Sequence, residues 1–279
     1  MSRVLFSLAA MAVAICLSAG VQAGEAELRA LAAKKAAVIK TLHDKATLAI
    51  VQVAQDPAFP TYFEAAHLGH HDHAHEAKVR IDNISLATQA KFHVEEMCLI
   101  DINGAEVSRI VKNQIAYDLS LEEASAPFFA PSFAGKPRTT YIAPRYMSPD
   151  VARWVIAYTT PIEVDGEKVA ILHYEHGLDF YQAALAREPA PEGTFVLAVD
   201  SEGYIVADTR SAIPIEQIGE SEDPGDYFQR FELGGMDLAG LKSALEAGAG
   251  VVALQDGGTD YMVASRSIAD WTIVAVEKL

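Results

Sequence analysis

The sequence of 279 residues has little cysteine, little tryptophan and a deficit of basic side chains. It contains two cysteines, Cys16 and Cys98, and two tryptophans. Because Cys16 lies in an N-terminal segment expected to be removed, a disulfide framework is excluded. Lys and Arg number 22 against 38 Asp and Glu, giving a net charge of −16. Negative charge repels phosphate backbones and anionic lipids, so nucleic acids and membrane surfaces are disfavoured partners.

The sequence also lacks the short motifs of common catalytic sites. It has no Gly-x-Ser-x-Gly nucleophile turn, no His-Glu-x-x-His zinc motif and no phosphate-binding P-loop. Gly248-Ala-Gly250 lacks the third glycine of a dinucleotide fingerprint. We therefore expect a protein that is not an enzyme, with an unrecognised hydrolase as the third alternative after the two binding functions described below.

Residues 1–23 predict a secretory signal peptide. Arg3 gives a positive start, residues 4–17 are almost unbroken apolar sequence, and Val21-Gln-Ala23 places small residues at the positions that precede cleavage. The apolar run is short for a bilayer span of about 20 residues, and an uncleaved anchor is the alternative. We expect cleavage after Ala23 and a periplasmic protein without a membrane span.

Two strand-turn-strand patterns of the same form occur far apart in the chain. The first turns at Asp101-Ile-Asn-Gly104 and the second at Asp200-Ser-Glu-Gly203, each between apolar, alternating runs. The pattern is typical of a β-hairpin, because glycine adopts positive φ and aspartate bonds the turn backbone. Two unrelated hairpins are the alternative. The order of the flanking segments repeats as well, which indicates two related α+β modules with antiparallel sheets.

A long helix precedes the two modules. Apolar residues recur at steps of three and four from Leu28 to Val53, interrupted by Lys35, and Asp56-Pro57 ends the pattern. A Pro- and Glu-containing stretch separates the modules and is typical of a linker. The predicted segments are the helix (24–59), the first module (60–186), the linker (187–193) and the second module (194–279).

The chain resembles the double Cache family, the PAS-like extracytoplasmic sensor domains of bacterial chemoreceptors and sensor kinases. The matching features, in chain order, are the long helix, Leu99–Glu106, Tyr146–Pro161, Val169–Leu178, Phe195–Asp208 and Trp271–Glu277. The resemblance implies a sensor that binds a small ligand in its first module, between the sheet and the overlying loops. No output segment follows Leu279 in this sequence. We therefore expect a free-standing sensor that acts with a membrane-bound receptor or kinase, and that can form a homodimer.

The resemblance also implies which residues bind the ligand. The amino-acid-binding branch of the family carries an Arg before a Trp-Tyr pair, a later Tyr and an Asp on a following strand. Here Phe128-Phe129 stands at the aromatic pair without the Arg, Tyr146 at the Tyr and Glu175 at the Asp. Capture of an α-carboxylate then loses its main partner, so a ligand carrying an amine is favoured over a standard amino acid. Arg138 or Arg145 can replace the missing charge, or lie in solvent.

Further side chains complete this candidate site. Trp154 and Tyr158 share one face of a predicted strand, and His173 and Glu175 share a face of the next. Such faces supply the aromatic walls and polar groups of a small-ligand site. Alternatively, the first pair belongs to the core and the second is a structural pair. The predicted ligand-binding residues are Phe128, Phe129, Tyr141, Arg145, Tyr146, Trp154, Tyr158, His173 and Glu175.

A cluster of histidines gives the alternative function, a periplasmic metal-binding protein. Neutral imidazole suits Zn, Cu and Ni, whereas the sensor function requires no cofactor. On one helix His67, His71 and His75 would share a face, but Gly69 favours a loop. The candidate metal ligands are His67, His70, His71, His73 and His75.

Overall fold

The computed structural model describes residues 4–279 except 93, 217–220, 222 and 249, and it describes no side chains before residue 24. The predicted signal peptide, residues 1–23, therefore lies outside the part of the chain whose side chains are described. Among the described residues, no helix combines the length and the apolar content that a bilayer span requires.

The chain divides into two compact units, each built on one antiparallel sheet. The seven-stranded unit comprises Thr41–Tyr181 and Pro214–Tyr227, and the five-stranded unit comprises Met1–Lys40, Gln182–Ile213 and Phe228–Leu279. Residues 214–227, which the sequence places in the second module, group with the seven-stranded unit because Trp154 N donates to Ile215 O at 2.9 Å. The predicted α+β fold, with a long N-terminal helix and two antiparallel-sheet modules, is confirmed.

The predicted long helix, residues 24–59, forms from its start but ends at Val53, three residues before Asp56 of the Asp56-Pro57 stop signal. Asp56 then accepts a hydrogen bond from Ala58 N at 2.9 Å, and the next helix begins at Ala58. The α-helices are α1 (Val4–Val53), α2 (Ala58–His67), α3 (His71–Phe92), α4 (Phe129–Ala134), α5 (Leu178–Ala186) and α6 (Leu238–Ala247).

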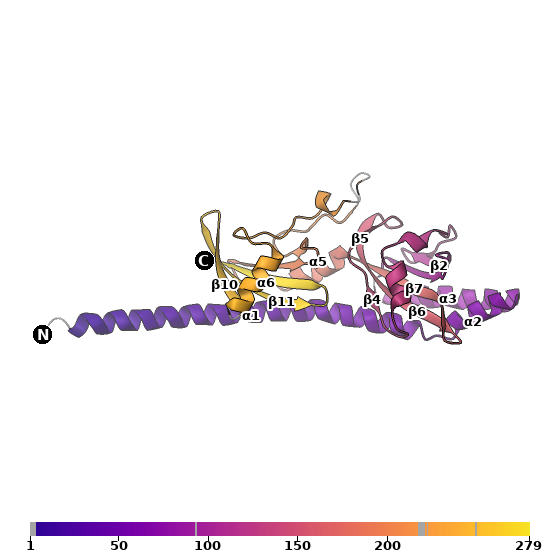
Figure 1. Ribbon diagram of the computed structural model, residues 1–279, viewed down its shortest axis with the longest axis horizontal. Coiled ribbons are helices and arrows are strands. Elements are labelled where there is room, and N and C mark those ends of the chain that lie inside the picture. Colours follow the sequence, from indigo (N-terminus) through magenta and orange to yellow (C-terminus); the bar gives the residue numbers. More distant parts are fainter. Residues whose placement is uncertain (1–3, 93, 217–220, 222, 249) are drawn as a thin grey trace. The chain divides into compact units, whose positions relative to one another are not determined.

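The seven-stranded sheet has the order β3-β2-β1-β7-β6-β4, and β5 pairs with β6. Its strands are β1 (Glu96–Asp101), β2 (Glu106–Val111), β3 (Gln114–Ile115), β4 (Tyr141–Ile142), β5 (Tyr146–Ser148), β6 (Arg153–Val164) and β7 (Glu167–Gly177). Figure 1 shows α2 and α3 beside this sheet.

Alternation along the central strands gives this sheet two differently covered faces. On one face, Tyr174 donates to a backbone carbonyl of α1, and Ser108 contacts Asp82 of α3 at 2.6 Å. On the other face, Ser132 of α4 contacts Thr159 of β6. Helices α1 and α3 therefore pack on one face, and the short α4 leaves room beside it on the other.

The five-stranded sheet has the order β10-β11-β12-β8-β9. Leu241 and Leu245 of α6 pack in one cluster with Val263 and Val274 of the sheet, and Asp237 caps the helix by accepting from Gly240 N at 2.8 Å. The strands are β8 (Thr194–Val199), β9 (Ile205–Asp208), β10 (Val251–Asp256), β11 (Thr259–Ile268) and β12 (Trp271–Lys278).

The two predicted hairpins have the same turn geometry. Asp101 Oδ1 accepts from two backbone N–H groups at 2.8 and 2.9 Å, and Asp200 Oδ1 accepts from two at 3.0 Å. Gly104 and Gly203 both have a φ of 86°. Each hairpin also carries a β-bulge just before its turn. The repeat seen in the sequence is therefore a repeat of backbone structure.

Lys35, which interrupts the apolar stripe of α1, is only 3% exposed. Its Nζ donates to Leu185 O at 2.6 Å and to Glu188 O, both at the C-terminal end of α5 or just beyond it. The last carbonyls of a helix lack intrahelical donors, so the ammonium group caps them. Burial lowers the pKa of Lys35.

We expect Lys35→Met to lower the free energy of unfolding by about 1–3 kcal/mol, because buried carbonyls lose their donor while the apolar stem is kept. The control is Lys34→Met, since Lys34 forms an exposed ion pair with Glu188. Such a pair contributes about 0–1 kcal/mol. Urea denaturation measures both variants. Equal losses would contradict the role of Lys35 as a helix cap.

Candidate functional site

A cavity of about 280 Å³ lies on the face of the seven-stranded sheet that α1 and α3 leave uncovered. Strands β1, β2, β5 and β7 form its walls, and residues 122–128 close one side. Its volume lies just below the range of about 300–1,000 Å³ usual for ligand pockets. The cavity can therefore hold a small molecule.

One wall of the cavity is aromatic. The rings of Phe128 and His173 stack with their centroids 4.1 Å apart, and Tyr146 lies 5.7 Å from Phe128. Tyr146 OH lies 3.0 Å from His173 Nε2 and donates to Glu175 Oε1. Burial lowers the pKa of His173 to about 3, so this imidazole is neutral.

The cavity is strongly acidic. Burial raises the pKa of both Glu96 and Glu175, whose Cα atoms are paired across β1 and β7. No Lys or Arg is among the described residues that line the cavity. Such a wall favours a cation. The carboxylates that line the cavity are Glu96, Glu106, Glu122, Glu123, Asp150 and Glu175.

The predicted ligand-binding residues separate into three groups. Phe128, Tyr146, His173 and Glu175 line the cavity. Phe129 and Tyr141 pack in the hydrophobic cluster beside it, and Arg145 is buried without lining it.

Trp154 and Tyr158 lie on the opposite, helix-covered face of the sheet. Tyr158 OH lies 2.6 Å from His43 Nδ1 and 2.5 Å from Tyr181 OH, and Trp154 contacts the ring of Tyr227. The two residues share a face as predicted, but that face is not the cavity wall. The reason is register: Ala157 and Thr159, not Tyr158, pair with Glu175 and His173.

Sequence reasoning missed several cavity residues. The wall includes three buried residues, Glu96 and Cys98 of β1 and Glu106 of β2. It also includes Ser148, the last residue of β5, and Asp150, two residues after that strand. One sequence pattern could have revealed Glu96 and Cys98 as cavity residues. They are two positions apart on a strand and therefore share a face, as His173 and Glu175 do on the neighbouring strand.

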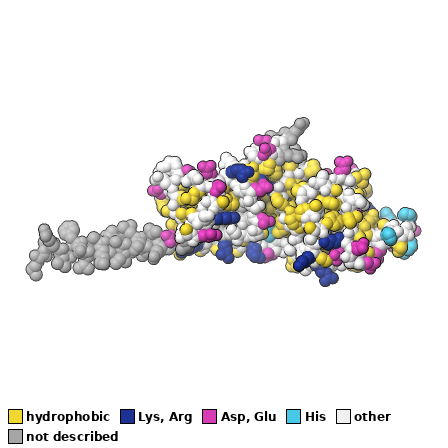
Figure 2. Space-filling view, in the orientation of Figure 1, with side chains coloured by type: hydrophobic (Ala, Val, Ile, Leu, Met, Phe, Trp, Pro, Cys, Tyr) yellow, Lys and Arg dark blue, Asp and Glu magenta, His cyan; other side chains and the backbone are white. Residues whose placement is uncertain are grey.

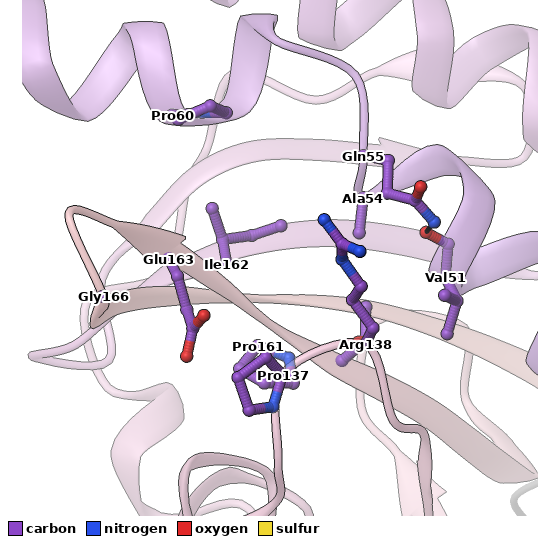
Figure 3. Close-up of a pocket in the computed structure, with 11 residues that line it drawn as sticks. Val51, Ala54, Gln55, Pro60, Pro137, Arg138, Pro161, Ile162, Glu163 and Gly166 are labelled. Atoms are coloured by element: carbon purple, nitrogen blue, oxygen red, sulfur yellow. Dashed lines mark hydrogen bonds between the residues drawn. The ribbon is translucent and has the colours of Figure 1, made fainter.

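A separate pocket of about 440 Å³ lies near the end of α1. Figure 3 shows the side chain of Arg138 extending between Ile162 and Gln55 there, with Glu163 nearby. Arg138 therefore does not supply the missing positive charge to the acidic cavity.

The clustered histidines are exposed and gather at the turn between α2 and α3 (Figure 2). Helix α2 ends at His67, Gly69 has a φ of 73°, and α3 begins at His71. The chain therefore breaks at Gly69 as expected, and His67, His71 and His75 do not share one helical face. Within the part of the chain that the structure describes, the histidines do not bring three ligand atoms together. The predicted histidine metal site therefore has no structural support.

No family model and no curated protein matches this chain by sequence. The chain is similar in structure to the sensory domain of the Campylobacter jejuni chemoreceptor Tlp3 (CcmL) with isoleucine bound. The identity is 12%, the match covers 94% of this chain and 95% of that chain, and the TM-score is 0.70.

Two further solved structures match over most of their length. The ligand-binding domain of the Pseudomonas fluorescens chemoreceptor CtaA, in complex with L-isoleucine, is 12% identical, with 94% of each chain covered and a TM-score of 0.62. The V. cholerae histidine kinase DctB sensor domain is 13% identical, with 92% of this chain and 98% of that chain covered and a TM-score of 0.61. This chain therefore has the Cache-type fold of chemoreceptor and histidine kinase sensor domains.

Proposed function

We propose that this protein is a non-enzymatic periplasmic sensor that binds a small cationic amine in the acidic cavity. The observation that carries the proposal is the composition of the cavity wall, which has six carboxyl side chains and no Lys or Arg among the described lining residues. Burial raises the pKa of the Glu96 and Glu175 carboxyls because it removes water from their charged forms. An ammonium group would stabilise their ionised form and also supply hydrogen-bond donors.

The aromatic wall supports the same class of ligand. The rings of Phe128 and Tyr146 line the cavity beside Glu175, and the neutral His173 does not repel a cation. A cation over an aromatic face gains about 0.5–2 kcal/mol. The amine would therefore lie between these rings and the carboxylate of Glu175.

An amino acid fits this cavity less well than an amine. The Tlp3 and CtaA domains were crystallised with isoleucine, which carries a carboxylate as well as an amine. In this chain Ser125, Ala126 and Pro127 precede the aromatic pair, and no guanidinium lines the cavity among the described residues. A ligand carboxylate would face the acidic wall without a partner, so we infer that the ligand lacks one.

The fold and the N-terminal sequence support a role in sensing outside the cytoplasm. The predicted signal peptide supports export, and the similar domains belong to chemoreceptors and histidine kinases. We infer that ligand binding shifts the population of conformations and that a membrane-bound receptor or kinase recognises the bound state.

A matched panel tests the ligand class. Each amino acid, such as isoleucine, phenylalanine or arginine, is compared with its decarboxylated amine (2-methylbutylamine, phenethylamine or agmatine) in a thermal-shift assay. We expect one or more amines to raise the Tm and their parent amino acids to have little effect. At a ligand concentration of 100 times Kd the stabilisation is about 2.7 kcal/mol. Equal stabilisation by amino acids, or none by any amine, would reject the proposal.

A further inference from the structure

We propose that Glu96, Cys98 and Glu106 form a binding site for a divalent cation of the zinc class. This inference goes beyond the proposed function, because it depends on three donor atoms and not on an amine. It also differs from the histidine site considered above, because its ligands are buried in the sheet.

The three donor atoms already have the spacing of a tetrahedral metal site. Cys98 Sγ lies 3.4 Å from Glu96 Oε1 and 3.2 Å from Glu106 Oε1, and all three donors lie within 4.8 Å of one another. Zinc bonds of about 2.3 Å to sulfur and about 2.0–2.2 Å to oxygen place tetrahedral S and O ligands about 3.5 Å apart. Little side-chain movement is needed to accept the ion.

Regular strands hold these ligands. Glu96 and Cys98 alternate on β1 and face the same side, while Glu106 begins the adjacent β2. Their exposed fractions are 2%, 2% and 6%. All three line the cavity, so the remaining coordination position of a tetrahedral ion would open into it.

The guanidinium of Arg109 lies beside the site and neutralises part of its negative charge. Arg109 is close to both glutamates, but its short contacts are with Asp118 and Asp150, at 2.8 and 2.9 Å. Its contacts with Glu106 and Glu96 are longer, at 3.6 and 3.9 Å.

Glu175 adds a second, independent observation. It is 2% exposed, lines the same cavity and pairs with Glu96 across the strands. Its Oε2 atom has no hydrogen-bond partner among the described residues. A buried carboxylate oxygen without a hydrogen-bond partner costs free energy because it has lost its hydration. A divalent ion bound at the neighbouring Glu96 would offset that cost for Glu175 Oε2.

The donor set selects the kind of ion. A thiolate ligand favours zinc and similar soft or borderline metals. Calcium takes six to eight oxygen ligands, and magnesium takes octahedral oxygen ligands. A buried site with one sulfur and two carboxylates therefore fits zinc better than either of these.

Cobalt(II) is the probe, because a thiolate ligand gives it a charge-transfer absorption band that oxygen and nitrogen ligands do not. The titration uses the protein from residue 24 to 279, in which the five clustered histidines are replaced by alanine. We expect the band to saturate at one cobalt per chain, to be lost in Cys98→Ser and to persist in the control Glu167→Gln, because Glu167 is exposed on β7. No band, or the same band in Cys98→Ser, would overturn the proposal.

A second variant, Glu106→Gln, tests the site independently in case Cys98→Ser does not fold. We expect Glu106→Gln to weaken Zn²⁺ binding at least tenfold in competition with a chromophoric chelator, while the circular dichroism spectrum is unchanged. Unchanged zinc affinity in this variant would remove Glu106 from the site and overturn the three-ligand proposal.

The same proteins separate this proposal from the amine proposal. If the amine panel gives no stabilisation but the cobalt band depends on Cys98, the metal site stands and the amine function fails. If an amine stabilises the protein but no band forms, the metal proposal alone fails. We expect Glu175→Gln to keep the cobalt band, because Glu175 is not one of the three ligands.

Discussion

Replacing Glu175 with glutamine is expected to weaken binding of the best amine from the panel by about 10- to 100-fold. The change removes the negative charge and keeps the size of the side chain. A hydrogen bond to a charged group contributes about 1.5–3 kcal/mol, and each 1.4 kcal/mol corresponds to a factor of ten in affinity. Isothermal titration calorimetry measures the change directly.

The matched control for Glu175→Gln is Glu167→Gln. Glu167 is on the same strand, β7, and it is exposed. We expect its replacement to leave amine affinity unchanged, although both variants lose one negative charge. A similar loss in the two variants would indicate that overall charge attracts the ligand, and unchanged affinity in Glu175→Gln would exclude this carboxylate as the amine receptor.

Replacing Tyr158 with alanine is expected to lower the free energy of unfolding by about 3–5 kcal/mol, the usual cost of removing a buried aromatic ring. Tyr158 has no exposed surface, and its ring lies against Tyr174, His176 and His43. Urea denaturation followed by circular dichroism measures the loss. A change below about 1 kcal/mol would be typical of a surface residue and would contradict this packing.

The variant Tyr158→Phe isolates the hydroxyl group, which lies within hydrogen-bond distance of His43 and Tyr181. Leaving such buried groups without a partner costs about 1–3 kcal/mol. Amine affinity should not change, because Tyr158 is on the face of the sheet away from the cavity. A stable Tyr158→Phe protein that no longer binds amine would return Tyr158 to the ligand site.

Sequence reasoning succeeded where the structure depends on local chemistry. The turns at Asp101 and Asp200 were predicted because the aspartate acceptors and the positive φ of glycine are encoded within a few residues. The pairing of Trp154 with Tyr158 on one face followed from the period of a strand. These features need no knowledge of distant contacts.

Sequence reasoning could not identify the cavity wall where both faces of a strand are buried. Strand β6 is apolar on both sides, so its sequence does not show which side α1 covers and which side borders the cavity. Trp154 and Tyr158 were therefore assigned to the wrong wall. Lys35 is a similar case, because its partners Leu185 and Glu188 are distant in sequence. The role of Glu96 and Glu106 likewise arises only when β1, β2 and β7 are side by side.

The two Asp-x-x-Gly turns differ in the space around their glycines, and this limits which residues each position can accept. A Cβ atom at Gly104 would lie 2.4 Å from Ala124 N, whereas the nearest atom at Gly203 would be the end of Arg230 at 3.9 Å. Glu123 N also donates to Gly104 O at 3.0 Å, next to the segment that closes the cavity. In evolutionary terms, position 203 is open to asparagine or aspartate, which tolerate positive φ. Position 104 is restricted to glycine, so of the two turns only the first is locked against the segment that closes the cavity.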